Sequence, residues 1–284
     1  MFQHYILTRF NLRANSWTTT KNNEKVLTEE WLKDRFDLFE NFCYNSVKNQ
    51  RNQNFKWLVF FDINTPDTYK QKVEKYNRDF ENFHPIFIDG MDNFLPEIIN
   101  NIKKLDSKKY IITSRLDNDD CIHENYTAVV QNQFNNQIHH AIDIIDGYTL
   151  ETGENTRLGY LMKLNNPFIS LIEKKEDFKT VWFRDRHGSW KYEKNMTKLK
   201  NERLWLSIIH AKNKVNRFSG YGNVKKTKLY PFHISGKRAA EIFDQMDSFK
   251  TWRLLSFKNR IKFTFKRHYK DFKGFIGLYN KTKD

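Results

Sequence analysis

The chain has 284 residues, of which 39% are hydrophobic and 16% aromatic. This is enough apolar material for a large core, and it excludes a chain that is disordered throughout. Gly and Pro number only 10 and 5, too few for the turns of a many-stranded β sandwich or barrel.

The net charge of +15 is uneven, because the last 35 residues hold eleven Lys and Arg and two Asp, a net +9. Such a tail favours an anionic partner, either a membrane or a nucleic acid. The first residues, MFQHYILTRFNLR, lack the basic region and long apolar run of a signal peptide. The two cysteines, Cys43 and Cys121, are expected to be buried free thiols. We therefore expect a cytoplasmic protein, soluble or peripheral on the inner membrane face.

Short apolar runs alternate with helical patterns over the first 120 residues. Helices are expected over residues 28–43, 65–80 and 94–102, with Thr28 as the first N-cap and Thr65-Pro66 as N-cap and first residue of the second helix. Strands are expected over residues 5–7, 55–61, 86–88 and 110–116. This order is typical of an α/β fold with a mostly parallel sheet and flanking helices. Such sheets bind ligands beyond the carboxyl ends of their strands.

The pattern changes after residue 138. Residues 141–150 and 158–164 resemble the two strands of a hairpin, with a turn near residues 152–155. Another strand is expected over residues 180–183, and a helix over residues 204–210.

The most distinctive feature is the segment Arg115-Leu116-Asp117-Asn118-Asp119-Asp120, in which a strand leads directly into three carboxylates. Because like charges repel one another, a divalent cation held by one or two carboxylates and by substrate phosphates fits this cluster. Asp117 and Asp119 are two residues apart, so in an extended chain their side chains point the same way. The alternative is an acidic turn in which Asp120 caps the following segment.

Several separated segments resemble one family, the bacterial rhamnosyltransferases, over roughly residues 1–220: ILTRFNLR, WLKDRFDLFENF, FKWLVFFD, TSRLDNDD and LWLSIIHAKN. The resemblance implies a GT-A-type, Rossmann-like glycosyltransferase whose DxD motif, here Asp117 and Asp119, binds Mn²⁺ or Mg²⁺. It also implies a UDP-, dTDP- or GDP-linked deoxyhexose donor and a glycan or lipid-linked acceptor. The expected division is a transferase domain over residues 1–235, with a nucleotide-sugar half (1–120) and an acceptor half (121–235). A basic helical extension follows over residues 236–284.

Other polar residues after strands are candidates for binding the nucleotide sugar. Thr8, Arg9 and Arg115 lie at strand ends on the expected ligand edge, where guanidinium groups suit diphosphate oxygens. Asp62 ends the second strand, where the resemblance implies contact with the base and ribose of the donor. Structural ion pairs with the aspartates remain the alternative for the arginines, and helix capping remains the alternative for Asp62.

An inverting transferase needs a base to deprotonate the acceptor hydroxyl. The Glu-Asp pair of related inverting enzymes is missing here, and the candidates are Glu202 and Asp185 in the second half. His210, within LWLSIIHAKN, is a candidate third metal ligand. His187, Trp190 and Phe168 are candidates for contact with the acceptor, since sugars stack on aromatic faces.

The basic tail has helical periodicity. Its apolar stripe is Leu254, Phe257, Ile261, Phe265, Phe272, Phe275 and Tyr279, and Lys258, Lys266, Lys270 and Lys273 lie off that stripe. The pattern is typical of an interfacial helix on an anionic membrane, and equally of a helix packed on the domain with a solvated basic face. The runner-up function is a nucleic-acid-binding protein or metal-dependent nuclease. We do not expect a nucleic-acid partner, because the excess charge lies far along the chain from the carboxylates.

Overall fold

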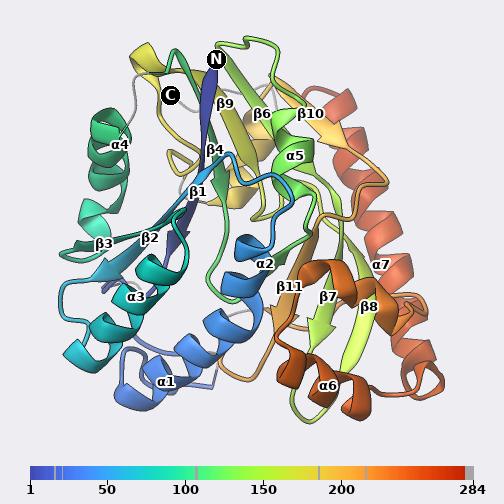
Figure 1. Ribbon diagram of the computed structural model, residues 1–284. Coiled ribbons are helices and arrows are strands. Elements are labelled where there is room, and N and C mark those ends of the chain that lie inside the picture. The colour runs from blue at the N-terminus through green and yellow to red at the C-terminus, as the bar shows by residue number, and fades with distance from the viewer. Residues whose placement is uncertain (16, 21, 106–107, 185, 215, 279–284) are drawn as a thin grey trace.

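A seven-stranded sheet forms the centre of the computed structural model, in the order β10-β6-β9-β4-β1-β2-β3 (Figure 1). The structure describes residues 1–284 except 16, 21, 106–107, 185, 215 and 279–284. The strands of this sheet are β1 (Phe2–Arg9), β2 (Lys56–Asp62), β3 (Phe83–Ile88), β4 (Tyr110–Arg115), β6 (His139–Ile144), β9 (Ser170–Lys174) and β10 (Met196–Leu199). All pairings are parallel except those of β9, which runs antiparallel to β4 and β6. The expected mostly parallel sheet is confirmed.

Helices cover both faces of this sheet, and the strand sequences explain why. Alternate residues of β1 and β2 point to opposite faces, so a strand that is apolar at every position buries both. One face packs against α1 (Glu29–Leu38), η1 (Phe39–Tyr44), α2 (Asn45–Lys48) and α3 (Asp67–Asp79). The other packs against α4 (Phe94–Leu105), which follows the short η2 (Met91–Asn93).

The expected N-cap of the first helix is confirmed. The N-cap expected for the second helix, Thr65, lies one residue before the observed one. Thr28 caps α1 by accepting a hydrogen bond from the backbone nitrogen of Trp31. Thr65 does not cap α3, because Pro66 is the N-cap residue there. The Thr65 hydroxyl instead donates to the carbonyl of Asp62 at 2.6 Å and accepts from Asn11 at 2.9 Å. Thr65 thus closes the turn after β2.

A second sheet, in the order β5-β11-β7-β8, is built from residues after the carboxylate cluster. Its strands are β5 (Cys121–Ile122), β7 (Asp146–Glu151), β8 (Arg157–Met162) and β11 (Trp205–Ile209), and the chain between them forms α5 (Tyr126–Gln131), η3 (Lys175–Asp177) and η4 (His187–Tyr192). The hairpin expected around residues 152–155 is confirmed as β7 and β8. Its first strand begins only at Asp146, because the chain passes from one sheet to the other at Ile145.

Two predictions of secondary structure after residue 138 are wrong. Residues 204–210 do not form a helix but contain β11, in which every residue is buried between β5 and β7. A short run that is apolar all round does not distinguish a buried strand from a buried helix. Residues 180–183 form turns rather than a strand, with Thr180 at a positive φ of 68°. The backbone nitrogen of Val181 donates to the Thr113 hydroxyl at 2.8 Å, which holds this turn against β4.

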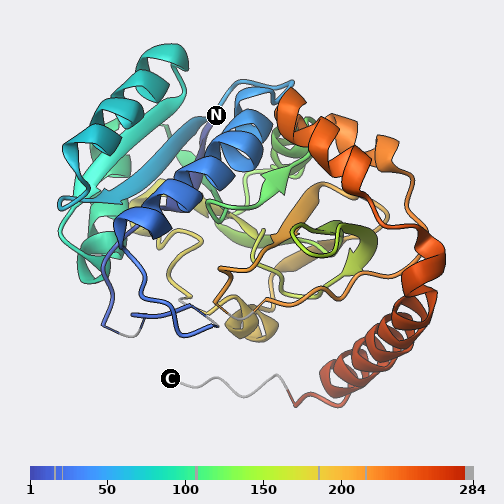
Figure 2. The same cartoon turned by 90° about the horizontal axis from the view of Figure 1, so that it is seen from below.

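The end of the chain forms η5 (Lys226–Phe232), α6 (Gly236–Gln245) and the long α7 (Phe249–Phe275). The expected helical extension is confirmed. Figure 2 shows α7 running along one edge of the molecule. Among the described residues, no helix combines the length and the apolar character needed to cross a membrane. Cys43 and Cys121 are free and buried, as expected.

Candidate active site

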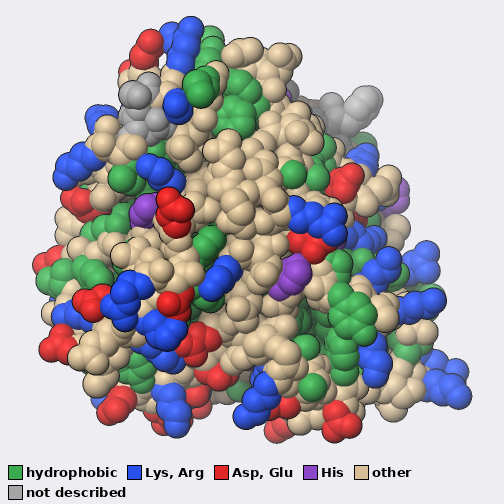
Figure 3. All heavy atoms as spheres, in the orientation of Figure 1, with side chains coloured by type: hydrophobic (Ala, Val, Ile, Leu, Met, Phe, Trp, Pro, Cys, Tyr) green, Lys and Arg blue, Asp and Glu red, His purple; other side chains and the backbone are tan. Residues whose placement is uncertain are grey.

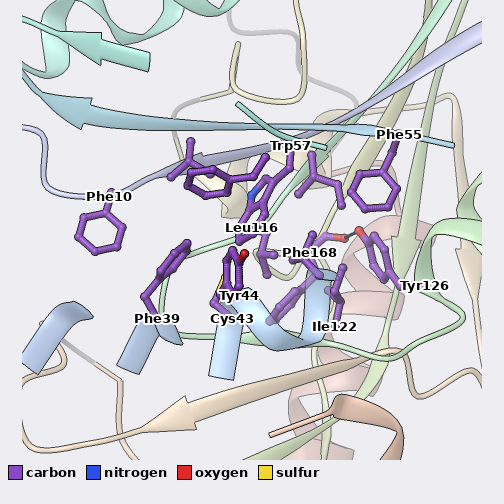
Figure 4. Close-up of a cluster of buried hydrophobic side chains, with 14 of the residues drawn as sticks. Phe10, Phe39, Cys43, Tyr44, Phe55, Trp57, Leu116, Ile122, Tyr126 and Phe168 are labelled. Carbon is purple, nitrogen blue, oxygen red and sulfur yellow. Dashed lines mark hydrogen bonds between the residues drawn. The ribbon is translucent and has the colours of Figure 1, made fainter. Parts of the chain in front are cut away.

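The carboxylate loop after β4 is anchored by a buried apolar cluster (Figure 4). Leu116, the residue before Asp117, is buried in this cluster with Phe10 and Cys43. The Asn118 amide donates to the carbonyl of Phe10 at 2.7 Å. The loop that carries the aspartates is therefore held by the packing of Leu116 and by the hydrogen bond from Asn118 to the residue after β1.

A cavity of about 1310 Å³ opens above this loop. It is lined by residues that follow β1 and β4, by residues of the second sheet, and by one flank of α7. Asp117 and Asp119 are in its wall. Since β1 and β4 are parallel neighbours, with Leu7 paired to Arg115, the residues after both strands reach the same edge of the sheet.

Two arginines stand at this edge of the cavity. The guanidinium carbons of Arg9 and Arg115 lie 5.2 Å and 3.9 Å from the centroid of the buried Trp182 ring. Arg115 Nη2 also lies 3.5 Å from Asp117 Oδ1. Trp182 therefore gives both guanidinium groups a fixed apolar surface. Trp182 comes from the turn that the sequence pattern assigns to a strand.

The three carboxylates of the cluster have different surroundings. Asp119 Oδ2 accepts from Arg35 Nη1 at 2.8 Å and from His210 Nε2 at 3.0 Å. Asp120 Oδ1 accepts from the backbone nitrogen of Ile208 at 2.8 Å and so ties the loop to β11. The Asp117 side chain is 29% exposed, and among the described residues its one ion-pair partner is Arg115, at the long distance of 3.5 Å. Asp120 is thus a structural cross-link to β11 rather than a cap.

These surroundings separate the pKa values of the two buried carboxyl groups. Burial raises the pKa of Asp120 well above its usual value, and the charges of Asp119 and Asp117 raise it further. Burial alone would also raise the pKa of Asp119, but the charge of Arg35 and the hydrogen bond from His210 outweigh it and lower that pKa. Asp119 is therefore a carboxylate at neutral pH.

His210 joins the cluster from the far end of β11. Its ring nitrogen Nε2 contacts Asp119 and lies 2.9 Å from the Asn213 amide nitrogen. His210 therefore lies directly beside Asp119. Within the part of the chain that the structure describes, no group of three or more His, Cys, Asp and Glu side chains converges as a ready-made metal site.

Comparison with known proteins assigns the family. The family model described as "Putative rhamnosyl transferase" matches residues 3–221. The chain belongs to the rhamnosyl transferase family. The description of this family is that of a glycosyltransferase, and the mostly parallel sheet with flanking helices of this chain is the expected GT-A-type fold. No curated protein matches this chain.

Several solved structures are similar to this chain. S. aureus TarS 1-349 is 12% identical, with a TM-score of 0.41, over 72% of this chain and 60% of that chain. The same protein in complex with UDP-GlcNAc is 11% identical, with a TM-score of 0.42, over 88% of this chain and 69% of that one. A nucleotide-diphospho-sugar transferase from Desulfovibrio desulfuricans G20 is 12% identical, with a TM-score of 0.40, over 87% of this chain and 100% of that one.

Two residues predicted to bind the nucleotide sugar lie outside the cavity. Thr8 is fully buried, and its hydroxyl accepts from the Trp57 indole nitrogen at 2.9 Å. Asp62 is buried and accepts from Arg13 Nε at 2.9 Å and from the backbone nitrogen of Asn64 at 3.0 Å. Both side chains hold the sheet edge together.

Of the two predicted catalytic carboxylates, Glu202 does not line the cavity. Glu202 is exposed and precedes β11, whereas His210 follows the other end of that strand. Five strand residues separate these ends by roughly 17 Å. Asp185 lies outside the described residues. The predicted helix would have brought Glu202 and His210 closer, because a helix rises only about 1.5 Å per residue.

The predicted acceptor residues divide in the same way. Phe168 and His187 line the cavity. Phe168 stacks on Trp205 with ring centroids 4.9 Å apart, so its apolar face is held rigidly. Trp190 is buried in the core, edge-on to Phe183 at 5.4 Å, and presents no indole face to an acceptor.

One residue of the site, Arg35, is not predicted from the sequence. Arg35 is buried on α1, within the apolar face that includes Leu32 and Phe36. An arginine within an apolar helical stripe is the available signal, since buried charges require a partner. That partner, Asp119, is 84 residues away in the chain.

Proposed function

We propose that this protein transfers rhamnose or another deoxyhexose from a nucleoside diphosphate donor to a hydroxyl of a glycan or lipid-linked acceptor. The transfer is metal-dependent, using Mn²⁺ or Mg²⁺, and inverting. The observation that carries the proposal is the position of Asp117 and Asp119 beyond the end of β4, in the wall of a large cavity and beside Arg9 and Arg115.

The donor diphosphate would lie along this edge of the sheet. Arg9 and Arg115 stack on Trp182, so their guanidinium planes are positioned before a ligand arrives. Guanidinium groups match phosphate oxygens in a bidentate manner, and pre-positioned donors lose less entropy on binding. These two arginines are the groups that would orient the diphosphate relative to the acceptor.

The proposed divalent cation would lie at Asp117 and Asp119. Asp117 and Asp119 would hold it, with His210 as a third ligand, and substrate phosphates would complete its coordination. Such an ion, when bound, neutralises the charge that develops on the leaving diphosphate. The buried Arg35 contacts Asp119 from α1 and keeps this carboxylate ionised and in place.

Deprotonation of the acceptor falls to His187 in this proposal. In the described part of the acceptor half, no Asp or Glu after Asp120 lines the cavity, and His187 is the histidine that does. Imidazole is the commonest general base in enzymes. His187 would take the proton of the acceptor hydroxyl as that oxygen attacks the anomeric carbon opposite the diphosphate.

Nucleotide release tests the proposal directly. The protein is incubated with UDP-, dTDP- and GDP-linked sugars, dTDP-rhamnose among them, with Mn²⁺ or with EDTA. We expect the nucleoside diphosphate to be released from one donor class with Mn²⁺ and not with EDTA. Release from none of them, together with cleavage or tight binding of single-stranded DNA, would favour a nuclease. Arg217, Lys262 and Lys266, which line the same cavity, make that outcome worth measuring.

A further inference from the structure

The helix α7 has two different faces, and one of them packs against the domain. Trp252, Ser256 and Asn259 are buried and recur at spacings of three and four residues. Ser256 Oγ accepts from the backbone nitrogen of Gly222 at 2.8 Å, and the Asn259 amide donates to the carbonyl of Gly220 at 3.0 Å. These contacts determine how the helix is rotated about its own axis.

The opposite face carries a row of large apolar side chains, which we call the exposed stripe: Leu254, Phe257, Ile261, Phe265, Tyr269 and Phe272. Each of these residues is between 50% and 77% exposed. Six such residues on one helix face exceed the scattered apolar surface that monomeric proteins normally show, and such patches mark interaction sites. The stripe largely matches the one expected from the sequence, of which Tyr279 lies outside the described residues and the Phe275 side chain is not described.

Charge identifies the partner of this stripe. The helix α7 contains nine Lys and Arg and one Asp. At about 100° per residue, Arg253 and Arg260 flank one side of the stripe, and Lys258 and Lys262 flank the other. Figure 3 shows Lys and Arg side chains gathered along the edge of the molecule where α7 lies. Apolar residues between rows of cations are typical of a helix that lies in the interface of an anionic bilayer. A second copy would instead bring two strongly basic helices together.

We propose that α7 docks the protein on an anionic lipid surface through the exposed stripe. The apolar side chains enter the boundary between headgroups and acyl chains, and the flanking Lys and Arg contact lipid phosphates. The packed face with Trp252 and Asn259 keeps the helix rigidly on the domain, so docking positions the whole molecule relative to the membrane.

This docking also determines which acceptors reach the site. Lys262, Lys266 and Tyr269 of α7 are in the wall of the cavity that contains Asp117 and Asp119. A membrane bound to the stripe therefore lies beside the opening of this cavity. If the proposed transferase function holds, the acceptor is a hydroxyl carried on a lipid phosphate, whose charge Lys262 and Lys266 would meet.

Co-sedimentation with vesicles tests the docking without any donor. The full chain is mixed with vesicles of phosphatidylglycerol and phosphatidylcholine or of phosphatidylcholine alone, at low and high salt. We expect binding to the anionic vesicles that high salt weakens, because screening shortens the range of the attraction. Phe257→Gln with Phe265→Gln should lower the partition coefficient roughly tenfold or more, given the transfer free energy of two phenylalanines.

The matched control is Ile138→Gln. Ile138 is 72% exposed, as the stripe residues are, but it precedes β6 and lies off α7. This variant should bind vesicles as the natural protein does, and unchanged melting of all variants would show that each one folds. Equal binding by the double variant and the natural protein would overturn the proposal. So would a dimer that the double variant dissociates, with no vesicle binding, since the stripe would then cover a second copy.

Nucleotide release by the double variant separates this proposal from the enzymatic one. Release from a soluble donor should continue at a normal rate when vesicle binding is lost, because neither of the two substituted residues lines the cavity. Vesicle binding by a protein that releases no nucleotide would support docking and contradict only the proposed transferase function.

Discussion

His210 Nε2 lies 3.0 Å from Asp119 Oδ2, although 91 residues separate them in the chain. The contact exists because β11, which ends just before His210, pairs with β5, which begins just after Asp120. On the other side of the same carboxylate, Arg35 Nη1 lies 2.8 Å away. Asp119 is therefore the residue at which α1, the loop after β4 and the end of β11 meet.

Nucleoside diphosphates should stabilise the protein only together with Mn²⁺ or Mg²⁺, because the carboxylates alone repel phosphate. At a ligand concentration near 100 times Kd, the gain should be roughly 2.7 kcal/mol. Thermal unfolding with UDP, dTDP or GDP, each with the metal and with EDTA, measures it. Equal stabilisation by the nucleotide in EDTA would remove the metal from the proposal and leave Arg9 and Arg115 as the diphosphate ligands.

Replacing either aspartate of the motif should abolish activity, but the two variants should differ in stability. Asp117→Asn and Asp119→Asn should both abolish transfer. Without metal, Asp117→Asn should change stability by no more than about 0.5 kcal/mol, since its side chain is 29% exposed. Asp119→Asn should cost about 1–3 kcal/mol, because it removes the partner charge of the buried Arg35.

Urea unfolding in EDTA, paired with nucleotide release in Mn²⁺, measures both quantities. From the sequence alone, relief of repulsion among three carboxylates predicts that Asp119→Asn keeps or gains stability. The ion pair with Arg35 reverses that expectation. A stable but inactive Asp119→Asn protein would show that Arg35 does not depend on this charge.

Replacing His187 should slow transfer to an acceptor far more than replacing Glu202. Loss of a general base typically lowers the rate by about 10²–10⁴-fold, so His187→Gln should lose this factor in kcat with little change in the KM of the donor. Glu202→Gln is the matched control, because Glu202 is exposed and does not line the cavity. A severe loss in Glu202→Gln with normal turnover in His187→Gln would reinstate Glu202 as the base.

His4 should make the protein less stable in acid. This residue is buried on β1, with Nε2 2.8 Å from Ser114 Oγ and Nδ1 3.2 Å from the Gln131 amide nitrogen. An amide nitrogen can only donate, so Nδ1 accepts and the imidazole is neutral. Burial lowers the pKa of His4 from 6.5 to about 3.

Because the folded protein binds this proton more weakly than the unfolded chain, the contribution to stability is complete above pH 6.5 and is lost as the pH falls toward 3. The loss between pH 6.5 and pH 5 should be about 2 kcal/mol. Urea unfolding at pH 7 and pH 5 measures it against His4→Asn, which should show a smaller difference between the two pH values. Identical pH dependence in both proteins would assign the acid sensitivity to other groups.

The fold of the first 120 residues follows from their sequence pattern. Continuous apolar runs such as residues 55–61 bury both faces of a strand, and their alternation with amphipathic helices specifies a parallel sheet. The sheet in turn specifies that the residues after β1 and β4, among them Arg9 and Asp117, share one edge. These inferences succeed because they depend on local periodicity and on a general rule of chain direction.

The second sheet and the surroundings of each charge depend on contacts between segments that are far apart in the chain. Residues 205–209 are all buried and four of the five are apolar, so their conformation is decided by β5 and β7 on either side of them. The partner of Arg35 and the roles of Asp119 and Asp120 depend on contacts across more than 80 residues of chain. The direction of the stripe on α7 likewise depends on which face finds Gly220 and Gly222. Periodicity shows that a helix has two faces, but burial against a particular neighbour decides which of them meets solvent.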